Sequence, residues 1–181
     1  MLKSKIRKKL LKIRKEKNFI NIKFPFSKIF NEIKKKNIKN KIIGGYYPIN
    51  FEIDILDFLS NIENKCSQVS LPVISENNQM DFYKWSYKDL LELNKFGIPE
   101  PLKNKKVIPD IVFLPLVAFD KRLYRIGYGG GYYDRYIEKL TTRKKTLKIG
   151  IAHSSQKINR VPINKYDRKL DMVITEKYVL R

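Results

Sequence analysis

A nearly continuous apolar run over residues 107–117 constrains the fold of this chain more than any other feature. Such a run is typical of a strand that is covered on both faces, as strands are in a parallel sheet. Segments of helical and of strand character alternate on both sides of the run, which supplies the helices that cover such a sheet. The run therefore predicts an α/β fold.

Apolar spacing predicts helices on both sides of the run, and no internal repeat is visible. The predicted helices span residues 2–17, 27–36, 52–62, 86–93 and 132–140. Further strands are predicted over residues 39–47, 69–74, 80–85, 147–152 and 172–175, with Asn77 and Asn78 in a turn. We expect one α/β domain over residues 1–181, built as three layers with a mostly parallel, Rossmann-like central sheet flanked by helices. Ligands of such folds bind at the carboxyl ends of the strands.

The apolar segments predict neither a membrane span nor a secretory signal. The longest apolar run, Ile111 to Phe119, is much shorter than the roughly 20 residues that cross a bilayer. The first residues contain neither an uninterrupted apolar stretch nor a small-residue cleavage site. Cys66 is the only cysteine, which excludes an internal disulfide and a cysteine-rich zinc site and favours a buried thiol. We therefore expect a cytoplasmic protein without a membrane partner.

The chain is strongly basic, with 39 Lys+Arg against 18 Asp+Glu and a formal net charge of +21. That balance is typical of nucleic-acid-binding proteins. Here, however, most of the basic residues are lysines spread along the chain beside many Asn and Ile residues, a pattern also produced by drift in an AT-rich genome. Charge therefore leaves two interpretations open, a basic cleft for a small anionic ligand and a nucleic-acid-binding surface.

The most informative segment for function is a glycine-rich loop between a strand and a helix. Four of the eight glycines fall within residues 127–131, and Arg125 and Arg135 flank them. Glycine lets the backbone approach a ligand, and backbone N–H groups beside a helix N-terminus attract anions. The loop lacks the sequence of a P-loop or of a dinucleotide fingerprint. It predicts a phosphate-binding site, with a tight turn as the structural alternative.

The glycine loop is part of a longer set of motifs. The central part reads Pro115-Leu116-Val117-Ala118-Phe119-Asp120, then Arg125-Ile126-Gly127-Tyr128-Gly129-Gly130-Gly131-Tyr132-Tyr133-Asp134-Arg135. Outside it are Lys3 and Arg7, Tyr46-Tyr47-Pro48 before Glu52-Ile53-Asp54, Pro109-Asp110, Gln156, and Val161-Pro162 before Asp167 and Asp171. Over nearly the whole chain, this set resembles the 5-formyltetrahydrofolate cyclo-ligase (5,10-methenyltetrahydrofolate synthetase) family. Ile126, Ile55 and Tyr166 depart from the residues common in that family.

The resemblance implies an ATP-dependent ligase of folate-based one-carbon metabolism. Family members convert 5-formyltetrahydrofolate and ATP to 5,10-methenyltetrahydrofolate, ADP and phosphate, with Mg²⁺. The formyl oxygen is phosphorylated, and N10 of the folate then attacks the activated carbon. The implied partners are ATP, Mg²⁺ and a reduced folate, with or without a polyglutamate tail. We expect a monomer and no specific nucleic-acid partner.

The resemblance also implies which residues form the site. Those implied for ATP are Lys3, Arg7, Arg125, Ile126, Gly127, Tyr128, Gly129, Gly130, Gly131, Tyr132 and Tyr133. Those implied for the folate are Tyr47, Glu52, Tyr128, Gly129, Gly130, Gly131 and Tyr132, with a carboxylate suited to the N–H donors of the pterin. Arg125 and Tyr132 are the catalytic candidates. Asp134 and Asp167 are the implied Mg²⁺ ligands, since Mg²⁺ usually takes one or two carboxylates beside substrate phosphates.

The charged residues of this set have structural alternatives. Lys3 and Arg7 could be the exposed face of a helix. Glu52 and Asp134 could be first-turn acids that the helix dipole favours. Asp167 could be a turn residue before the last strand.

The aromatic residues and the function have alternatives too. Of Tyr132 and Tyr133, we expect one to face the core and the other the ligand. The only histidine, His153, and the only tryptophan, Trp85, are expected to be structural. A basic nucleic-acid-binding protein, and another ATP-dependent ligase or kinase on the same fold, are the alternative functions.

Overall fold

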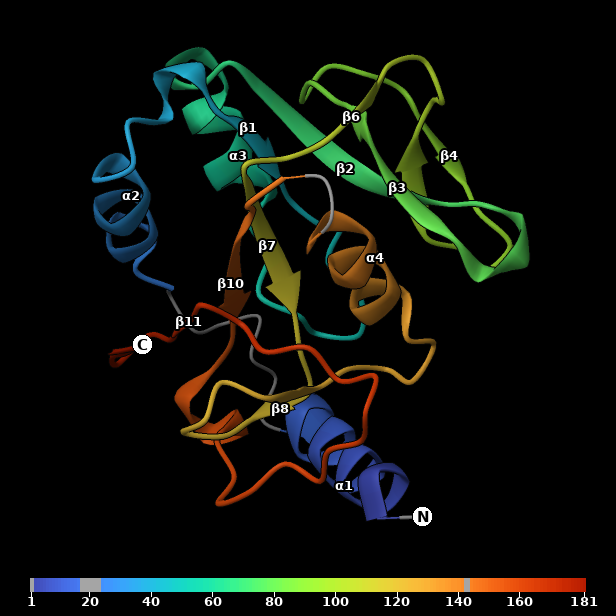
Figure 1. The fold of residues 1–181 in the computed structure, drawn as a ribbon, viewed down its shortest axis with the longest axis vertical. Coiled ribbons are helices and arrows are strands. Elements are labelled where there is room, and N and C mark those ends of the chain that lie inside the picture. Colours follow the sequence, from blue (N-terminus) through green and yellow to red (C-terminus); the bar gives the residue numbers. More distant parts are fainter. Residues whose placement is uncertain (1, 17–23, 142–143) are drawn as a thin grey trace.

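The computed structural model describes the chain except for residues 1, 17–23 and 142–143. Its centre is an eight-stranded sheet in the order β12-β11-β10-β7-β1-β2-β3-β6 (Figure 1). The strands are β1 (Ile42–Gly44), β2 (Gln68–Ile74), β3 (Met80–Lys84), β6 (Lys106–Val107), β7 (Ile111–Pro115), β10 (Leu147–Ile151), β11 (Met172–Ile174) and β12 (Val179–Leu180). Strands β11, β10, β7, β1 and β2 run parallel, and the outer strands pair antiparallel at both edges. The predicted α/β class with a mostly parallel sheet is confirmed.

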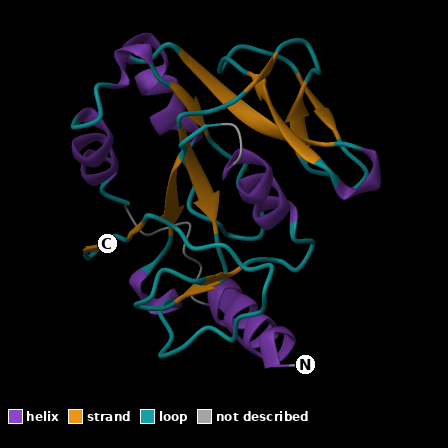
Figure 2. Ribbon diagram, in the orientation of Figure 1, coloured by secondary structure: helices purple, strands orange, loops and turns teal. Residues whose placement is uncertain are grey.

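Helices cover both faces of this sheet (Figure 2). The α-helices of the described residues are α1 (Leu2–Glu16), α2 (Phe26–Lys34), α3 (Leu56–Ile62) and α4 (Tyr132–Thr141). Helices α2 and α3 pack with Phe113 in one core cluster, whereas α4 packs with Val112 and Leu114 in another. Successive side chains of a strand point to opposite faces, so β7 contributes to both clusters. The three predicted layers follow from this alternation.

The apolar run at residues 107–117 is not one strand, contrary to the prediction. Val107 ends the edge strand β6, and Ile111 begins β7 in the middle of the sheet. Between them, Pro109 has no N–H to donate to a strand ladder. The Asp110 carboxylate accepts a 2.9 Å hydrogen bond from the backbone of β1. The chain therefore crosses from the edge of the sheet to its centre at this Pro-Asp pair.

The helix predicted over residues 86–93 is also wrong. Two short strands, β4 (Leu91–Leu93) and β5 (Pro99–Pro101), form a separate antiparallel hairpin instead. The side-chain oxygen of Asn94 closes its turn by accepting the N–H of Ile98 at 3.1 Å. Such side-chain-to-backbone bonds compete with helix formation. Turn chemistry therefore decides this segment.

Other predicted elements differ in their bounds. The helix predicted from residue 2 is confirmed through Glu16, and residue 17 lies outside the described part of the chain. Strand β1 is shorter than predicted because Ile38–Asn40 form a 3₁₀ turn. Helix α3 begins at Leu56, four residues later than the predicted start at Glu52.

A second small hairpin lies at the carboxyl end of β7. It consists of β8 (Ala118–Phe119) and β9 (Arg125–Ile126), and it packs with Ile6 and Leu10 of α1 (Figure 1). Helix α1 is thereby held near the carboxyl end of β7, where the glycine loop begins. None of the helices in the described ranges is long and apolar enough to cross a membrane.

Candidate functional site

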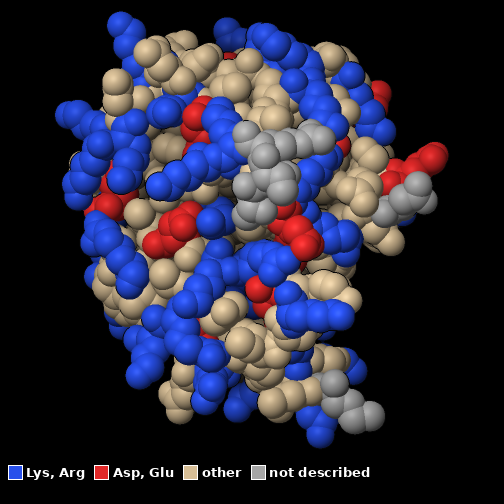
Figure 3. Space-filling view, in the orientation of Figure 1, with Lys and Arg blue, Asp and Glu red and all other residues tan. Residues whose placement is uncertain are grey.

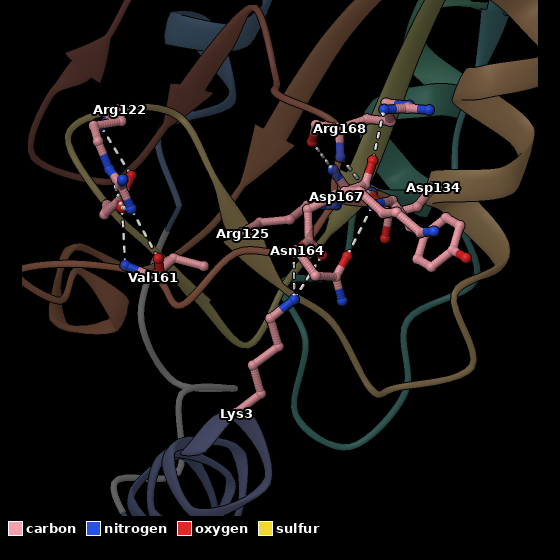
Figure 4. Close-up of polar contacts among 11 residues, drawn as sticks. Lys3, Arg122, Arg125, Asp134, Val161, Asn164, Asp167 and Arg168 are labelled. Carbon is pink, nitrogen blue, oxygen red and sulfur yellow. Dashed lines mark hydrogen bonds and ion pairs between the residues drawn. The ribbon is translucent and has the colours of Figure 1, made fainter. Parts of the chain in front are cut away.

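Helix α1 contacts the glycine loop and a C-terminal segment through two basic side chains. Lys3 Nζ lies 2.6 and 2.5 Å from the two carboxylate oxygens of Asp167 (Figure 4). One turn later, Arg7 Nε donates a 2.7 Å hydrogen bond to the carbonyl oxygen of Gly127. Neither side chain therefore lies on a simply solvated helix face, which was the alternative interpretation.

Arg125 is the buried cation beneath this site, with 7% of its surface exposed. Its guanidinium donates to Asp134 Oδ1 and to the carbonyl oxygen of Arg168, each at 2.8 Å, and the Arg168 N–H donates to the same Asp134 oxygen at 3.1 Å (Figure 4). Burial lowers the pKa of Arg125, and the nearby Asp134 and Asp167 carboxylates oppose that shift. The guanidinium therefore fixes Asp134 at the start of α4.

The two aspartates predicted as metal ligands come together around Arg125, although 33 residues separate Asp134 from Asp167. Asp167 also accepts the N–H of Asn164 at 2.6 Å. Across the described ranges, no group of three or more His, Cys, Asp or Glu side chains gathers as an all-protein metal site would require. Two carboxylates suit Mg²⁺, which usually takes few protein ligands and completes its shell with phosphates and water. The donor chemistry therefore fits the implied ion.

The backbone conformation of the loop requires glycine at two positions. Gly129 and Gly131 have φ values of +110° and +68°, in the region that side chains other than glycine rarely adopt. A β-carbon on Gly129 would lie 3.2 Å from the Arg7 guanidinium, and one on Gly131 would lie 2.8 Å from Arg135 Nη1. At Gly127, by contrast, a β-carbon would enter open space. The positive φ values therefore require glycine at 129 and 131, and arginine side chains pack closely on the same two residues.

The Glu52 carboxyl group precedes α3 and belongs to a cluster of polar groups, the Glu52 pocket, which is defined by its neighbours Ile49, Arg14 and Tyr128. Because α3 starts at Leu56, the alternative of a first-turn acid does not apply to Glu52. Its Oε2 accepts the N–H of Ile49 at 2.9 Å. Burial raises the pKa of Glu52 to about 7, and the Ile49 hydrogen bond, the Arg14 charge and a hydrogen bond with Tyr128 act in the opposite direction. The carboxyl group is therefore poised between its neutral and ionised forms at neutral pH.

Tyrosines surround the Glu52 carboxyl group. Burial, reinforced by the Glu52 charge, raises the pKa of Tyr128 to about 12 and also raises those of Tyr46 and Tyr133. Tyr46 donates a 2.7 Å hydrogen bond to the backbone of the same segment. Tyr47, predicted to contact the folate, is half-buried next to it. One carboxylate and three tyrosine hydroxyl groups thus interact in this cluster.

The paired tyrosines at the start of α4 face different surroundings. Both Tyr132 and Tyr133 pack partly against the core cluster of α4, and Tyr133 is close enough to Glu52 for the carboxylate charge to raise its pKa. Tyr132 also donates a 3.2 Å hydrogen bond to Asn78 and lies edge-on to Phe96, with ring centroids 6.4 Å apart. Tyr132 therefore reaches the surface beside the β4–β5 hairpin. Its catalytic role stays a prediction.

Three residues at the site were not predicted from the sequence. Arg14 of α1 is buried against Tyr128 of the glycine loop, and Asn78 and Phe96 contact Tyr132 at the start of α4. Arg14 follows Arg7 by seven residues, which places the two on one helix face. That spacing is the signal that could have revealed it.

The remaining candidates are structural. Trp85 is buried in the core cluster that α2 and α3 share. Burial lowers the pKa of His153, which begins the 3₁₀ turn Ser154–Gln156. Burial raises the pKa of the Cys66 thiol, which disfavours the nucleophilic thiolate.

Basic side chains cover the visible face of the molecule without forming a single stripe. In Figure 3, Lys and Arg are spread over this face with Asp and Glu between them. A single-strand binder instead concentrates basic and aromatic residues along one groove. The basic residues on this face do not match that pattern.

Comparison with known proteins gives the relationship of the chain. The sequence profile of the 5-formyltetrahydrofolate cyclo-ligase family matches residues 1–176. A 5-formyltetrahydrofolate cyclo-ligase of Haemophilus influenzae is 32% identical over 144 residues, which are 76% of this chain and 75% of that protein. One of Mycoplasma genitalium is 35% identical over 143 residues, which are 78% of this chain and 75% of that protein.

Solved structures agree with these matches. A 5,10-methenyltetrahydrofolate synthetase of Aquifex aeolicus has a TM-score of 0.77 and 34% identity, and the match covers 100% of this chain and 93% of that chain. A synthetase of Mycoplasma pneumoniae has a TM-score of 0.70 and 26% identity, covering 97% and 99%. Fold and relatives together define this chain as an enzyme of the ligase class. It belongs to the 5-formyltetrahydrofolate cyclo-ligase family, which confirms the resemblance seen in the sequence.

Proposed function

We propose that the chain converts 5-formyltetrahydrofolate and ATP to 5,10-methenyltetrahydrofolate, ADP and phosphate. Beyond family membership, one observation supports this proposal most. Lys3, Arg7 and the glycine loop converge near the carboxyl end of β7, and Tyr128 of the same loop interacts with Glu52. The reaction needs an anion site for the phosphates of ATP and a carboxylate beside aromatic residues for the pterin ring.

The chemistry explains why ATP is consumed. A formamide carbon is a poor electrophile, and its oxygen is a poor leaving group. Transfer of the γ-phosphoryl group to that oxygen releases ADP and turns the oxygen into part of a good leaving group. N10 then attacks the formyl carbon, and phosphate departs with the N10 proton. The protein mainly positions groups and stabilises charge, as is general for phosphoryl transfer.

On the nucleotide side, Lys3 and Arg7 bind the phosphates from the first turns of α1. The backbone of the glycine loop wraps the same phosphates with its N–H groups. Arg125 holds Asp134 in place through the 2.8 Å ion pair and stabilises the negative charge that develops at the transferred group. Mg²⁺, when bound, neutralises phosphate charge, and Asp134 and Asp167 are the residues that would hold it. The Lys3 ammonium group would then leave the Asp167 carboxylate and pair with a phosphate.

On the folate side, Glu52 accepts the N–H donors of the pterin ring. Tyr47 and the tyrosines of the pocket pack against its faces, and Tyr132 closes the pocket beside the formyl group. A carboxylate binds these donors most strongly when it is ionised. The site therefore works best when Glu52 has lost its proton.

The test is the rise in absorbance of methenyltetrahydrofolate when the protein, 5-formyltetrahydrofolate, ATP and Mg²⁺ are mixed. We expect product only when ATP is present, and a loss of at least tenfold in kcat/KM for Lys3→Ala. Lys5→Ala, which changes an exposed lysine of the same helix, is the matched control. Tight, salt-dependent binding of single-stranded DNA without folate-dependent ATP turnover would show that the chain is a nucleic-acid-binding protein instead. ATP turnover with another acceptor would indicate a different ligase or kinase.

A further inference from the structure

Arg14 is the buried residue of helix α1, with 3% of its surface exposed. It lies near the end of the helix whose first turns carry Lys3 and Arg7. Burying an arginine is costly unless its N–H donors find acceptors. The contacts of Arg14 therefore show what the fold gains from placing a charge there.

The Arg14 guanidinium joins three segments that are far apart in the sequence. Its Nη2 donates to the carbonyl oxygen of Leu116 at 2.5 Å, just after β7. Its Nη1 donates to the hydroxyl oxygen of Tyr128 at 2.9 Å, in the glycine loop, and to the carbonyl oxygen of Asn50 at 3.4 Å. Asn50 lies two residues before Glu52. One side chain thus links α1, the glycine loop and the Glu52 segment.

The charge of Arg14 also acts on the Glu52 pocket. The ion pairs of the described residues do not include Arg14, so its charge is not taken up by a close carboxylate. The groups that face Glu52 are Arg14 and the hydroxyls of Tyr46, Tyr128 and Tyr133. Arg14 is the cation among them, and it favours the ionised carboxylate that the pterin would need.

Two further titratable groups lie around this network. His153 faces Arg14 from the segment after β10, and burial lowers the pKa of that imidazole, so it is neutral at pH 7. Asp54 faces Tyr46 and adds to the rise in the pKa of its hydroxyl. The Arg14 charge is therefore the one that compensates for the buried position of Glu52.

We propose that Arg14 is a positioning residue that holds the nucleotide end of the site in register with its folate end. The inference rests on the proposed function, which puts ATP phosphates at Lys3 and Arg7 and the pterin at Glu52. A guanidinium presents several donors in a rigid planar fork and can serve three acceptors at once, whereas a lysine ammonium cannot reproduce that geometry. The planar fork binds the three acceptors, and the positive charge favours the ionised Glu52 carboxylate. Arg14→Lys removes the fork alone, whereas Arg14→Met removes both the fork and the charge.

The experiment compares Arg14→Met and Arg14→Lys with Lys15→Met, which removes an exposed charge one residue away. Hydrogen exchange of the ligand-free protein is followed in segments 46–54 and 125–133, and the pH profile of kcat/KM is measured. We expect exchange at least tenfold faster in both segments for Arg14→Met and Arg14→Lys, since neither carries the fork. The acid limb of the pH profile should move to higher pH in Arg14→Met and stay in place in Arg14→Lys. Lys15→Met should match the wild type in both measurements.

One outcome would refute the proposal, and a second variant serves if Arg14→Met does not fold. Wild-type exchange in both segments and an unchanged pH profile, with only a lower unfolding midpoint for Arg14→Met, would mean that Arg14 is merely structural. If Arg14→Met does not fold, Tyr128→Phe removes one of the acceptors alone, and exchange in segment 125–133 must then rise. Failure of the wild type to form methenyltetrahydrofolate would refute the proposed function, while the exchange data would still decide whether Arg14 couples the segments.

Discussion

Replacing Glu52 by glutamine should stabilise the ligand-free protein and at the same time impair folate binding. Burial raises the pKa of this carboxyl group from 4.5 to about 7. Between these two pH values the folded state holds more protons than the unfolded chain, so the free energy of unfolding falls as the pH rises. At pH 8 the ionised, buried carboxylate costs about 3 kcal/mol, and at pH 5 about 1 kcal/mol, taking about 1.4 kcal/mol per pKa unit.

The amide of Glu52→Gln keeps the shape and the acceptor for the Ile49 N–H but removes the charge. Urea unfolding at pH 8 should therefore show a gain of about 3 kcal/mol over the wild type, shrinking to about 1 kcal/mol at pH 5. Calorimetric titration with 5-formyltetrahydrofolate at pH 8 should show at least tenfold weaker binding for the variant. Asp57→Asn, at an exposed acid of α3, is the matched control.

Two results would refute this reasoning. An unfolding free energy that differs from the wild type by the same amount at pH 5 and pH 8 would show that Glu52 does not titrate in this range. Undiminished folate affinity in the variant would show that the pterin does not use this carboxylate.

Three further predictions concern the phosphate side and the lone thiol. Gly129→Val must adopt φ +110° and displace the Arg7 guanidinium, so ATP affinity should fall at least tenfold by calorimetry, with a stability loss of about 1–2 kcal/mol; unchanged ATP affinity would show that the phosphates do not bind at this loop. Asp134→Asn and Asp167→Asn should each raise the Mg²⁺ concentration for half-maximal turnover, and unchanged requirements would remove both from the metal site. Asp134→Asn alone should also cost about 2 kcal/mol of stability in chemical unfolding, because it leaves the buried Arg125 without its counter-charge. Cys66 should react with a thiol reagent at pH 7.5 at least tenfold more slowly than free cysteine, because burial raises its pKa, and equal rates would contradict the burial argument.

The fold was largely predictable because its strongest signals are periodic. Strand β7 has apolar residues on both faces, and the sequence shows them as a run without alternation. The break between β6 and β7 was missed because Pro109 and Asp110 act through tertiary pairing with the backbone of β1, which the run does not reveal. The β4–β5 hairpin was missed because the hydrogen bonds that the Asn94 side-chain oxygen accepts from the backbone of Phe96 and Ile98 outweigh helical spacing.

The candidate site was predictable where its residues form a sequence motif. It was less predictable where the properties of a residue depend on burial by neighbours from other segments. Lys3, Arg7 and Asp167 were recognised from motifs, and the structure brings them together although Asp167 is far away in the chain. Arg14 was missed because a basic residue in a lysine-rich helix looks solvated, although its seven-residue spacing from Arg7 places it on the helix face that contacts the glycine loop. The elevated pKa of Glu52 likewise depends on neighbours from other segments.

The ion pair between Lys3 and Asp167 has a consequence for turnover. Lys3 pairs with Asp167 and Arg125 with Asp134, so the site carries its own counter-ions. In the proposed reaction an incoming phosphate must displace an internal carboxylate from Lys3, which lowers the net gain from binding. The same carboxylate is ready to take the lysine back when phosphate has formed, and this return favours departure of the anion. Strong phosphate binding residues and rapid product release are thereby compatible in one enzyme.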